Sequence, residues 1–303
     1  MSTIHVGSEL DDEARRARLH RGHLFVLAPT PGTEALCTLA RAMIEEAFAP
    51  HDPTRAQFEM GVEEFVGVLG PLKPRFIHDP RTLELISQIV VEVGCDPEGT
   101  YIDVPRLRGV TSHGYLTSGV GYAHHPHRDT WYSAPLCQLN WWIPIYGFEP
   151  ESSMAFHPRY WAEAVPNGSE EFNYYEWNAI GRREAAKHVR TDGRKQPRAR
   201  VDLELEPMVR VVCEPAGIVL FSGAQMHSTV PNTSGLTRFS MDFRTVHLGD
   251  LRSGHGAANV DSRCHGTSLR DFVQAADRSA MPADVVERYD DVVDPEGVLV
   301  YGR

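Results

Sequence analysis

A short run near the middle of the chain carries side chains that bind metal ions. Residues 121–131 read GYAHHPHRDTW and hold three of the fifteen histidines. His127 and Asp129 stand two positions apart, so on an extended strand both point to one face, with Cα atoms roughly 6.5–7 Å apart. At that separation an imidazole nitrogen and a carboxylate oxygen reach the same ion. The run therefore predicts two ligands of a metal site.

A third ligand is expected on a later strand. Residues 217–232 contain an apolar segment, a Ser-Gly turn and then His227. Two histidines and one carboxylate form the facial triad of non-haem Fe(II) oxygenases, which leaves three coordination positions open. Arg238 follows His227 by eleven residues, and Ser240 shares its face of the same predicted strand. A guanidinium beside a hydroxyl suits the far carboxylate of a dicarboxylate co-substrate.

These motifs resemble those of the Fe(II)/2-oxoglutarate-dependent dioxygenases, and within them the phytanoyl-CoA dioxygenase-like family. The resemblance spans about residues 110–246 and is carried by residues 127–129, 139–145, 217–232 and 238–240. It implies a double-stranded β-helix of the jelly-roll or cupin-like type. It also implies Fe(II) bound by His127, Asp129 and His227, and a 2-oxoglutarate C5 carboxylate held by Arg238 with the help of Ser240.

The resemblance implies an oxidation that consumes O2 and 2-oxoglutarate and releases succinate and CO2. The oxidised group is a C–H bond of a small metabolite, hydroxylated or otherwise changed. Asn140, on the polar face of its predicted strand, is a further candidate for binding the co-substrate. Arg244 has two possible roles: it could bind the 2-oxoglutarate carboxylate in place of Arg238, or it could pair with Asp242. Candidate substrate contacts are three aromatic residues and two arginines: Tyr115, Tyr122, Trp131, Arg182 and Arg183.

Two other classes of protein use the same residue types. His125, His127 and Asp129 match the start of the His-x-His-x-Asp-His motif of metallo-β-lactamase-like hydrolases, although Thr130 stands where the last histidine belongs. A non-catalytic, cupin-like binding protein would keep the barrel without turnover. Against it, nothing except a metal and a co-substrate requires the triad and an arginine together.

The elements that must position these residues change in character along the chain. Helices are predicted at 9–18, at 34–48 with Thr33 as cap, at 58–69 ending at Gly70-Pro71, and at 80–93 with Asp79 as cap. Strands rich in β-branched and aromatic residues are predicted at 100–104, 109–116, 136–146, 209–213, 217–221 and 237–246. Helices first and strands afterwards predict an α+β chain, a jelly-roll core packed by N-terminal helices.

Alternation assigns faces to two of these strands. Within 237–245 the apolar residues Phe239, Met241 and Phe243 point away from Arg238 and Ser240. Within 138–146 the apolar face opposes Gln138 and Asn140 and consists of Leu139, Trp141, Ile143 and Ile145. Such strands suit a barrel covered by helices outside, with a polar pocket inside.

A single dioxygenase domain is expected over residues 1–303. Its parts are a helical N-terminal support (1–98), the jelly-roll core (99–250) and a C-terminal extension (251–303) with a helix near 269–276. The core holds a lid-like insert at about 159–201. Between 182 and 200 this insert has eight basic and two acidic residues. That balance predicts either a solvated face or a basic lid over an anionic substrate.

The net charge and composition of the chain limit the kinds of partner and location that we expect. A net charge of −11 disfavours nucleic acid, which needs a basic surface. No stretch is apolar enough to cross a membrane, and no signal peptide begins the chain, so a cytoplasmic location and a small-molecule substrate are expected. Five scattered cysteines argue against a disulfide framework and against a thiolate zinc site.

Overall fold

The computed structural model describes residues 3–121, 124–181 and 192–292, which form a mixed α/β fold around a large, mostly antiparallel sheet. This sheet has the order β1-β2-β8-β5-β10-β3-β11, and β4 pairs with β10 beside that path. Its strands are β1 (Ile4–Val6), β2 (Leu24–Leu27), β3 (Thr100–Ile102), β4 (Arg106–Val110), β5 (Leu139–Pro144), β8 (Ile218–Ser222), β10 (Arg238–His247) and β11 (Val273–Gln274). A smaller antiparallel sheet has the order β7-β6-β9, with bounds Val209–Val211, Met154–Phe156 and His227–Thr229.

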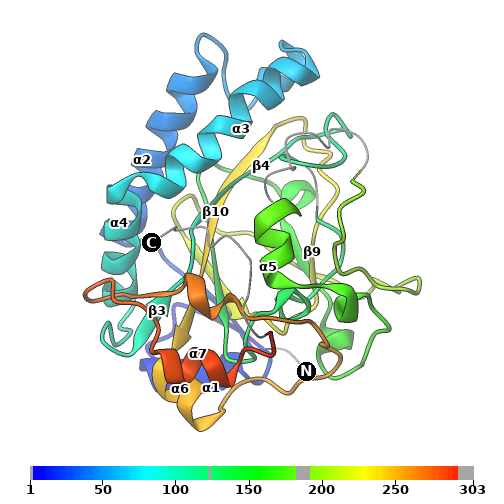
Figure 1. Cartoon of the computed structure of the whole chain (residues 1–303). Coiled ribbons are helices and arrows are strands. Elements are labelled where there is room, and N and C mark those ends of the chain that lie inside the picture. Colours follow the sequence, from blue (N-terminus) through cyan, green and yellow to red (C-terminus); the bar gives the residue numbers. More distant parts are fainter. Residues whose placement is uncertain (1–2, 122–123, 182–191, 293–303) are drawn as a thin grey trace.

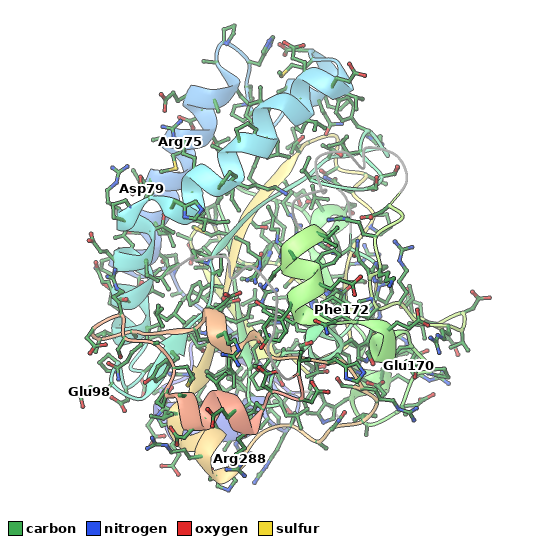
Figure 2. The ribbon with its side chains drawn as sticks, in the orientation of Figure 1. Arg75, Asp79, Glu98, Glu170, Phe172 and Arg288 are labelled. Atoms are coloured by element: carbon green, nitrogen blue, oxygen red, sulfur yellow. The ribbon has the colours of Figure 1, made fainter. Side chains whose placement is uncertain are left out.

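Three helices lie together on one side of the large sheet (Figure 1). They are α2 (Pro31–Phe48), α3 (Val62–His78) and α4 (Pro80–Glu92). Asp79 caps α4 at the corner between α3 and α4, as predicted (Figure 2). At the other end of the molecule lie α1 (Asp12–Leu19), α6 (Leu248–Ser253) and α7 (Ala283–Arg288), where Arg16 of α1 pairs with Asp250 of α6 at 2.8 Å.

The predicted faces of β5 and β10 are confirmed. Phe239, Met241 and Phe243 of β10 join the helical side of the core, where Leu36, Phe65 and other helix residues pack against them. Leu139, Trp141, Ile143 and Ile145 lie in the same cluster. The opposite face of the sheet looks toward the smaller sheet, and the cluster between the two sheets consists of Leu24, Trp142, Met154, Phe156, Val211, Val219 and Phe221. Polar residues of β5 and β10 open onto that inner space.

Helix α3 runs past the Gly70-Pro71 pair at which the sequence predicted its end, so that boundary was wrong. The rings of Pro71 and Pro74 are exposed, whereas Leu72 and Phe76 continue the buried face. An interior proline costs a helix roughly 3 kcal/mol. Burying a Leu or Phe side chain contributes about 1.5–3 kcal/mol, so the apolar face offsets much of that cost.

Other boundaries also differ from the predictions. Helix α2 begins earlier because Thr30, not Thr33, is its N-cap, with Pro31 at the first helical position. The strand predicted at 109–116 is β4, which ends at Val110, because His113 and Gly114 adopt left-handed backbone angles. The helix predicted near 269–276 is a short 3-10 helix (Ser268–Asp271) followed by β11, which completes the edge beside β3.

In the part of the chain that the structure describes, no helix is long and apolar enough to cross a membrane.

The continuation of α3 beyond Pro71 predicts a stability difference. Leu72 is 2 % exposed, so Leu72→Ala should lower the free energy of unfolding by about 2–5 kcal/mol in urea titrations. The control Val91→Ala, at a position 53 % exposed, should change it by less than about 0.5 kcal/mol. A Leu72→Ala value as small as the control would contradict the packed helix.

Candidate metal centre

Three residues come together as the sequence predicted. One ligand atom from each of His127, Asp129 and His227 lies within 4.8 Å of the others, so this group can hold a metal ion. Asp129 Oδ1 is 3.5 Å from His127 Nε2 and 3.9 Å from His227 Nε2. The side chains come from two distant segments, and the three atoms converge on one point between the sheets.

Backbone pairing sets the two histidines side by side. His127 and His227 form an antiparallel bridge, with N–H···O distances of 2.9 and 3.0 Å between them. His227 is the first residue of β9 and pairs with Phe156 of β6. Asp129 begins the 3-10 helix η2 (Asp129–Tyr132), so the ligand pair lies where a strand-like segment ends rather than within a regular strand.

Each imidazole is oriented by a carbonyl oxygen. His127 Nδ1 donates to the carbonyl of His125 at 2.8 Å, and His227 Nδ1 donates to the carbonyl of Gln225 at 2.9 Å. Because a carbonyl only accepts, both protons sit on Nδ1 and both Nε2 lone pairs are free for a metal.

The two carboxylate oxygens of Asp129 have different contacts. Its Oδ2 accepts hydrogen bonds from Gln138 Nε2 at 3.2 Å, Asn140 Nδ2 at 3.0 Å and Arg244 Nε at 3.1 Å. Its Oδ1 faces the two histidines. Three donors therefore fix the group and leave a single oxygen to bind a metal.

The electrostatics keep these ligands in metal-binding states. Burial raises the pKa of Asp129, but the neighbouring His127 and His227 and the charge of Arg106 outweigh that effect and lower the pKa to about 2. Burial and the neighbouring His127 lower the pKa of His227 to about 4. At neutral pH Asp129 is therefore charged and His227 neutral, and metal binding needs no proton release from either.

Arg128, between the two ligands in sequence, points the opposite way and is 1 % exposed. Its Nε donates to Asp261 Oδ2 at 3.2 Å, and its Nη1 donates to the Ala224 carbonyl at 2.7 Å. Asp261 also accepts from Trp131 Nε1 at 2.7 Å and from the Val165 amide at 3.0 Å. This buried pair ties the metal-binding segment to the C-terminal extension and to the insert.

Arg238 is buried and incompletely paired. It is 6 % exposed, and its Nε and Nη1 find no hydrogen-bond partner among the described residues. The same holds for Oγ of Ser240, which is 0 % exposed and two positions along β10. Burial and the charge of Arg108 lower the pKa of Arg238 to about 10, so the guanidinium stays protonated at neutral pH. An unpaired buried cation beside an unpaired hydroxyl fits a carboxylate ligand.

Asn140 and Arg244 both contact the metal ligand Asp129. The Asn140 amide donates to Asp129 and accepts from Gln138 Nε2 at 2.9 Å, so both of its polar atoms are engaged. Arg244 pairs with Asp242 at 3.2 Å, as one of its two interpretations predicted, and with Asp129 as well. Arg244 is thus ion-paired with both carboxylates, although its Nη1 has no hydrogen-bond partner among the described residues, and two guanidinium nitrogens of Arg238 have none.

The predicted substrate residues are scattered. Tyr115 lies in the helical layer, where its hydroxyl donates to the Met60 carbonyl at 2.9 Å. Trp131 is 0 % exposed and packs with Tyr160 behind the metal-binding segment. Tyr122, Arg182 and Arg183 fall outside the described residues.

The other two histidines of the run lie beside the metal group. His125 Nε2 donates to the Pro197 carbonyl at 3.0 Å, and burial with the nearby His127 lowers the pKa of His125 to about 4. The metallo-β-lactamase-like alternative would use His125, His127 and Asp129 as metal ligands. Among the described residues, the group that can hold a metal contains His227 instead of His125. His124 Nε2 lies 3.3 Å from Arg108 Nη1.

Sequence reasoning missed two supports of the site. Gln138 could have been found, because it lies two positions before Asn140 on the same predicted polar face. Asp261 had no local signal, since its partner Arg128 is 133 positions away.

No protein-family model matches this chain, and no curated protein matches it either. Among solved structures it is similar to EvdO2 from Micromonospora carbonacea var. aurantiaca, with 14% identity over 80% of this chain and 93% of that chain and a TM-score of 0.45. The epimerase SnoN, solved with Fe3+, alpha ketoglutarate and nogalamycin RO, is 14% identical over 78% of this chain and 85% of that chain, with a TM-score of 0.41. The carbocyclase SnoK from nogalamycin biosynthesis is 15% identical over 79% and 85%, with a TM-score of 0.40.

Arg244 should control how tightly the centre binds metal. Arg244→Gln removes one of three donors to Asp129 Oδ2. The loss of ligand orientation should outweigh the weaker charge repulsion, so Co(II) affinity measured by calorimetry should fall about 10- to 100-fold. Arg263→Gln, which changes an arginine whose side chain is 77% exposed, is the matched control and should leave the affinity unchanged. Equal affinities in the two variants would show that the three donors do not orient the ligand.

The Arg128–Asp261 pair should matter for stability and for the metal. Asp261→Asn leaves the buried guanidinium without its counter-charge, and the free energy of unfolding should fall by about 3–5 kcal/mol. Its Co(II) affinity should fall as well, because the segment carrying His127 and Asp129 loses its anchor. Asp284→Asn on α7 serves as the control. Loss of stability with unchanged affinity would mean that the pair holds the fold but not the metal ligands.

Proposed function

We propose that this chain is a non-haem Fe(II)- and 2-oxoglutarate-dependent oxygenase of the phytanoyl-CoA dioxygenase-like type. The observation that carries the proposal is the combination of the triad with a buried, unpaired Arg238 and Ser240 on β10. A hydrolase or a plain metal-binding protein has no need for that second, cationic site.

The strand order supports a double-stranded β-helix. From β4 to β10, the chain passes between the two sheets, with β4, β5, β8 and β10 in the large one and β6, β7 and β9 in the small one. The segment at His127 bridges to β9 and extends the small sheet. Successive crossings of this kind are typical of jelly rolls, whose inner faces enclose ligand sites.

The ligand set supports iron as the metal. Two imidazoles and one carboxylate make up the facial-triad ligand set that suits Fe(II). Fe(II) with bound 2-oxoglutarate supplies the oxidising power of the reaction by activating O2.

The chain's own residues contribute binding and orientation. Arg238 and Ser240 hold the far carboxylate of 2-oxoglutarate, and stacking of the guanidinium over Trp142 (5.3 Å from the ring centroid) sets its plane. Gln138, Asn140 and Arg244 engage Oδ2 of Asp129, so that Oδ1 alone would bind a metal and the co-substrate would find positions open. Burial of the triad between the sheets excludes bulk water. The substrate is a small molecule oxidised at a C–H bond.

The proposal predicts co-substrate turnover without any known substrate. Protein loaded with Fe(II) under anaerobic conditions and then given O2 should convert 2-oxoglutarate to succinate slowly. Asp129→Ala should abolish this succinate. Arg238→Ala should raise the KM for 2-oxoglutarate about tenfold or more, because a charged hydrogen bond is lost, and Arg238→Lys should recover part of it. Arg263→Ala is again the control. Tight zinc binding with no succinate formation would overturn the proposal.

A further inference from the structure

A buried amide in the insert has no partner. Asn178 is 4 % exposed, and neither its Oδ1 nor its Nδ2 makes a hydrogen bond to any described residue. Buried polar side-chain atoms in native proteins are nearly always paired, and an amide with both atoms unpaired is rare. A bound ligand could supply the missing hydrogen-bond partners of this amide.

Asn178 lies in the π-helical turn Trp177–Gly181, which follows the short helix α5 (Tyr174–Glu176). Tyr174, Asn178 and Gly181 are buried and share one face, whereas Ile180 on the other face is 54 % exposed. π-Helical turns are rare and occur often at functional sites. The amide therefore points inward from a turn that is itself unusual.

A path of aromatic rings connects this turn to the metal centre. The ring of His127 lies 5.6 Å from Tyr132, Tyr132 lies 5.2 Å from Phe172, and Phe172 lies 6.0 Å from Trp177. Figure 2 places Phe172 at the start of the helical segment that carries α5, in the middle of the molecule. The helical segment thus packs over the side of the barrel where the ligands lie.

Two hydrogen bonds place the ends of the segment. At one end the Tyr174 hydroxyl donates to Asp271 Oδ2 in the C-terminal extension. At the other end Arg194 Nη1 donates to the Gly181 carbonyl at 3.1 Å. Asn178 lies between these ends on the inward face.

The insert offers little surplus positive charge where the structure describes it. Three of the four basic residues at 194–200 have acidic partners. Residues 194–200 therefore give little support to the alternative of a basic lid over an anionic substrate. The pairs are Arg194 with Asp192 at 2.5 Å, Lys195 with Glu176 at 3.6 Å, and Arg200 with Glu170 and Glu171 at 2.6 and 2.5 Å.

We propose, resting on the oxygenase function above, that Asn178 binds the substrate and that the substrate presents a neutral carboxamide or lactam to it. Such a group offers a donor and an acceptor side by side, which match Oδ1 and Nδ2 of the asparagine. A carboxylate has only acceptors and would leave Oδ1 unpaired. The half-buried rings of Tyr132 and Trp177 on the same path suit a substrate with a flat ring.

The test uses two probes of the same shape, 4-fluorobenzamide and 4-fluorobenzoate, titrated by ¹⁹F NMR. The protein is loaded with Zn(II) and 2-oxoglutarate, so that no turnover occurs and the carboxylate probe is kept from the metal and from Arg238. The amide should bind at least about tenfold more tightly than the carboxylate, and Asn178→Leu should remove that preference. Glu176→Gln, on the exposed side of the same helix, should retain it.

A second measurement separates a binding role from a structural one. Asn178→Leu removes two unpaired buried atoms, so without probe its Tm should rise by about 2 °C. A fall in Tm, equal binding of the two probes, binding of neither, or a preference that survives Asn178→Leu would each overturn the proposal. Succinate formation by the Fe(II) protein, measured separately, reports on the oxygenase function alone, so the two failures are distinguishable.

Discussion

The site depends on how one carboxylate is held. Asp129 gives Oδ2 to Gln138, Asn140 and Arg244 and turns only Oδ1 toward the histidines. A carboxylate with both oxygens unengaged could bind a metal through either one oxygen or two. Because three donors engage Oδ2, Asp129 would offer a bound metal one oxygen, and more coordination positions would remain for other ligands. Much of the polar face of β5 and β10 serves this purpose.

Strand β10 contributes one face to the hydrophobic core and the other face to the polar space between the sheets. Phe239, Met241 and Phe243 bury its outer face under the helices. On its inner face, two nitrogens of Arg238 and the hydroxyl of Ser240 have no hydrogen-bond partner in the part of the chain that the structure describes. The apolar contacts compensate for the cost of burying a cation that lacks a partner. A cation held in this way would need little rearrangement to bind an anionic ligand.

The sequence predicted the parts of the site that follow from local rules. His127, Asp129 and His227 were recognisable by residue type, spacing and order, and strand alternation placed the inner and outer faces of β5 and β10 correctly. Predictions failed where tertiary packing overrides local preference, as when α3 continues through Pro71. The three-residue strand β6 carries too short a pattern to detect, and the unpaired amide of Asn178 is visible only once its surroundings are known.

The pairing of Arg128 with Asp261 has a consequence for the order of folding. The two residues are 133 positions apart, so closing this contact waits for nearly the whole chain. During synthesis, when the N-terminal part emerges first, the segment with His127 and Asp129 exists long before its anchor does. The geometry of the His127–Asp129–His227 group is thus expected to be among the last features to form, and an incomplete chain on the ribosome would lack the arrangement that can hold a metal ion.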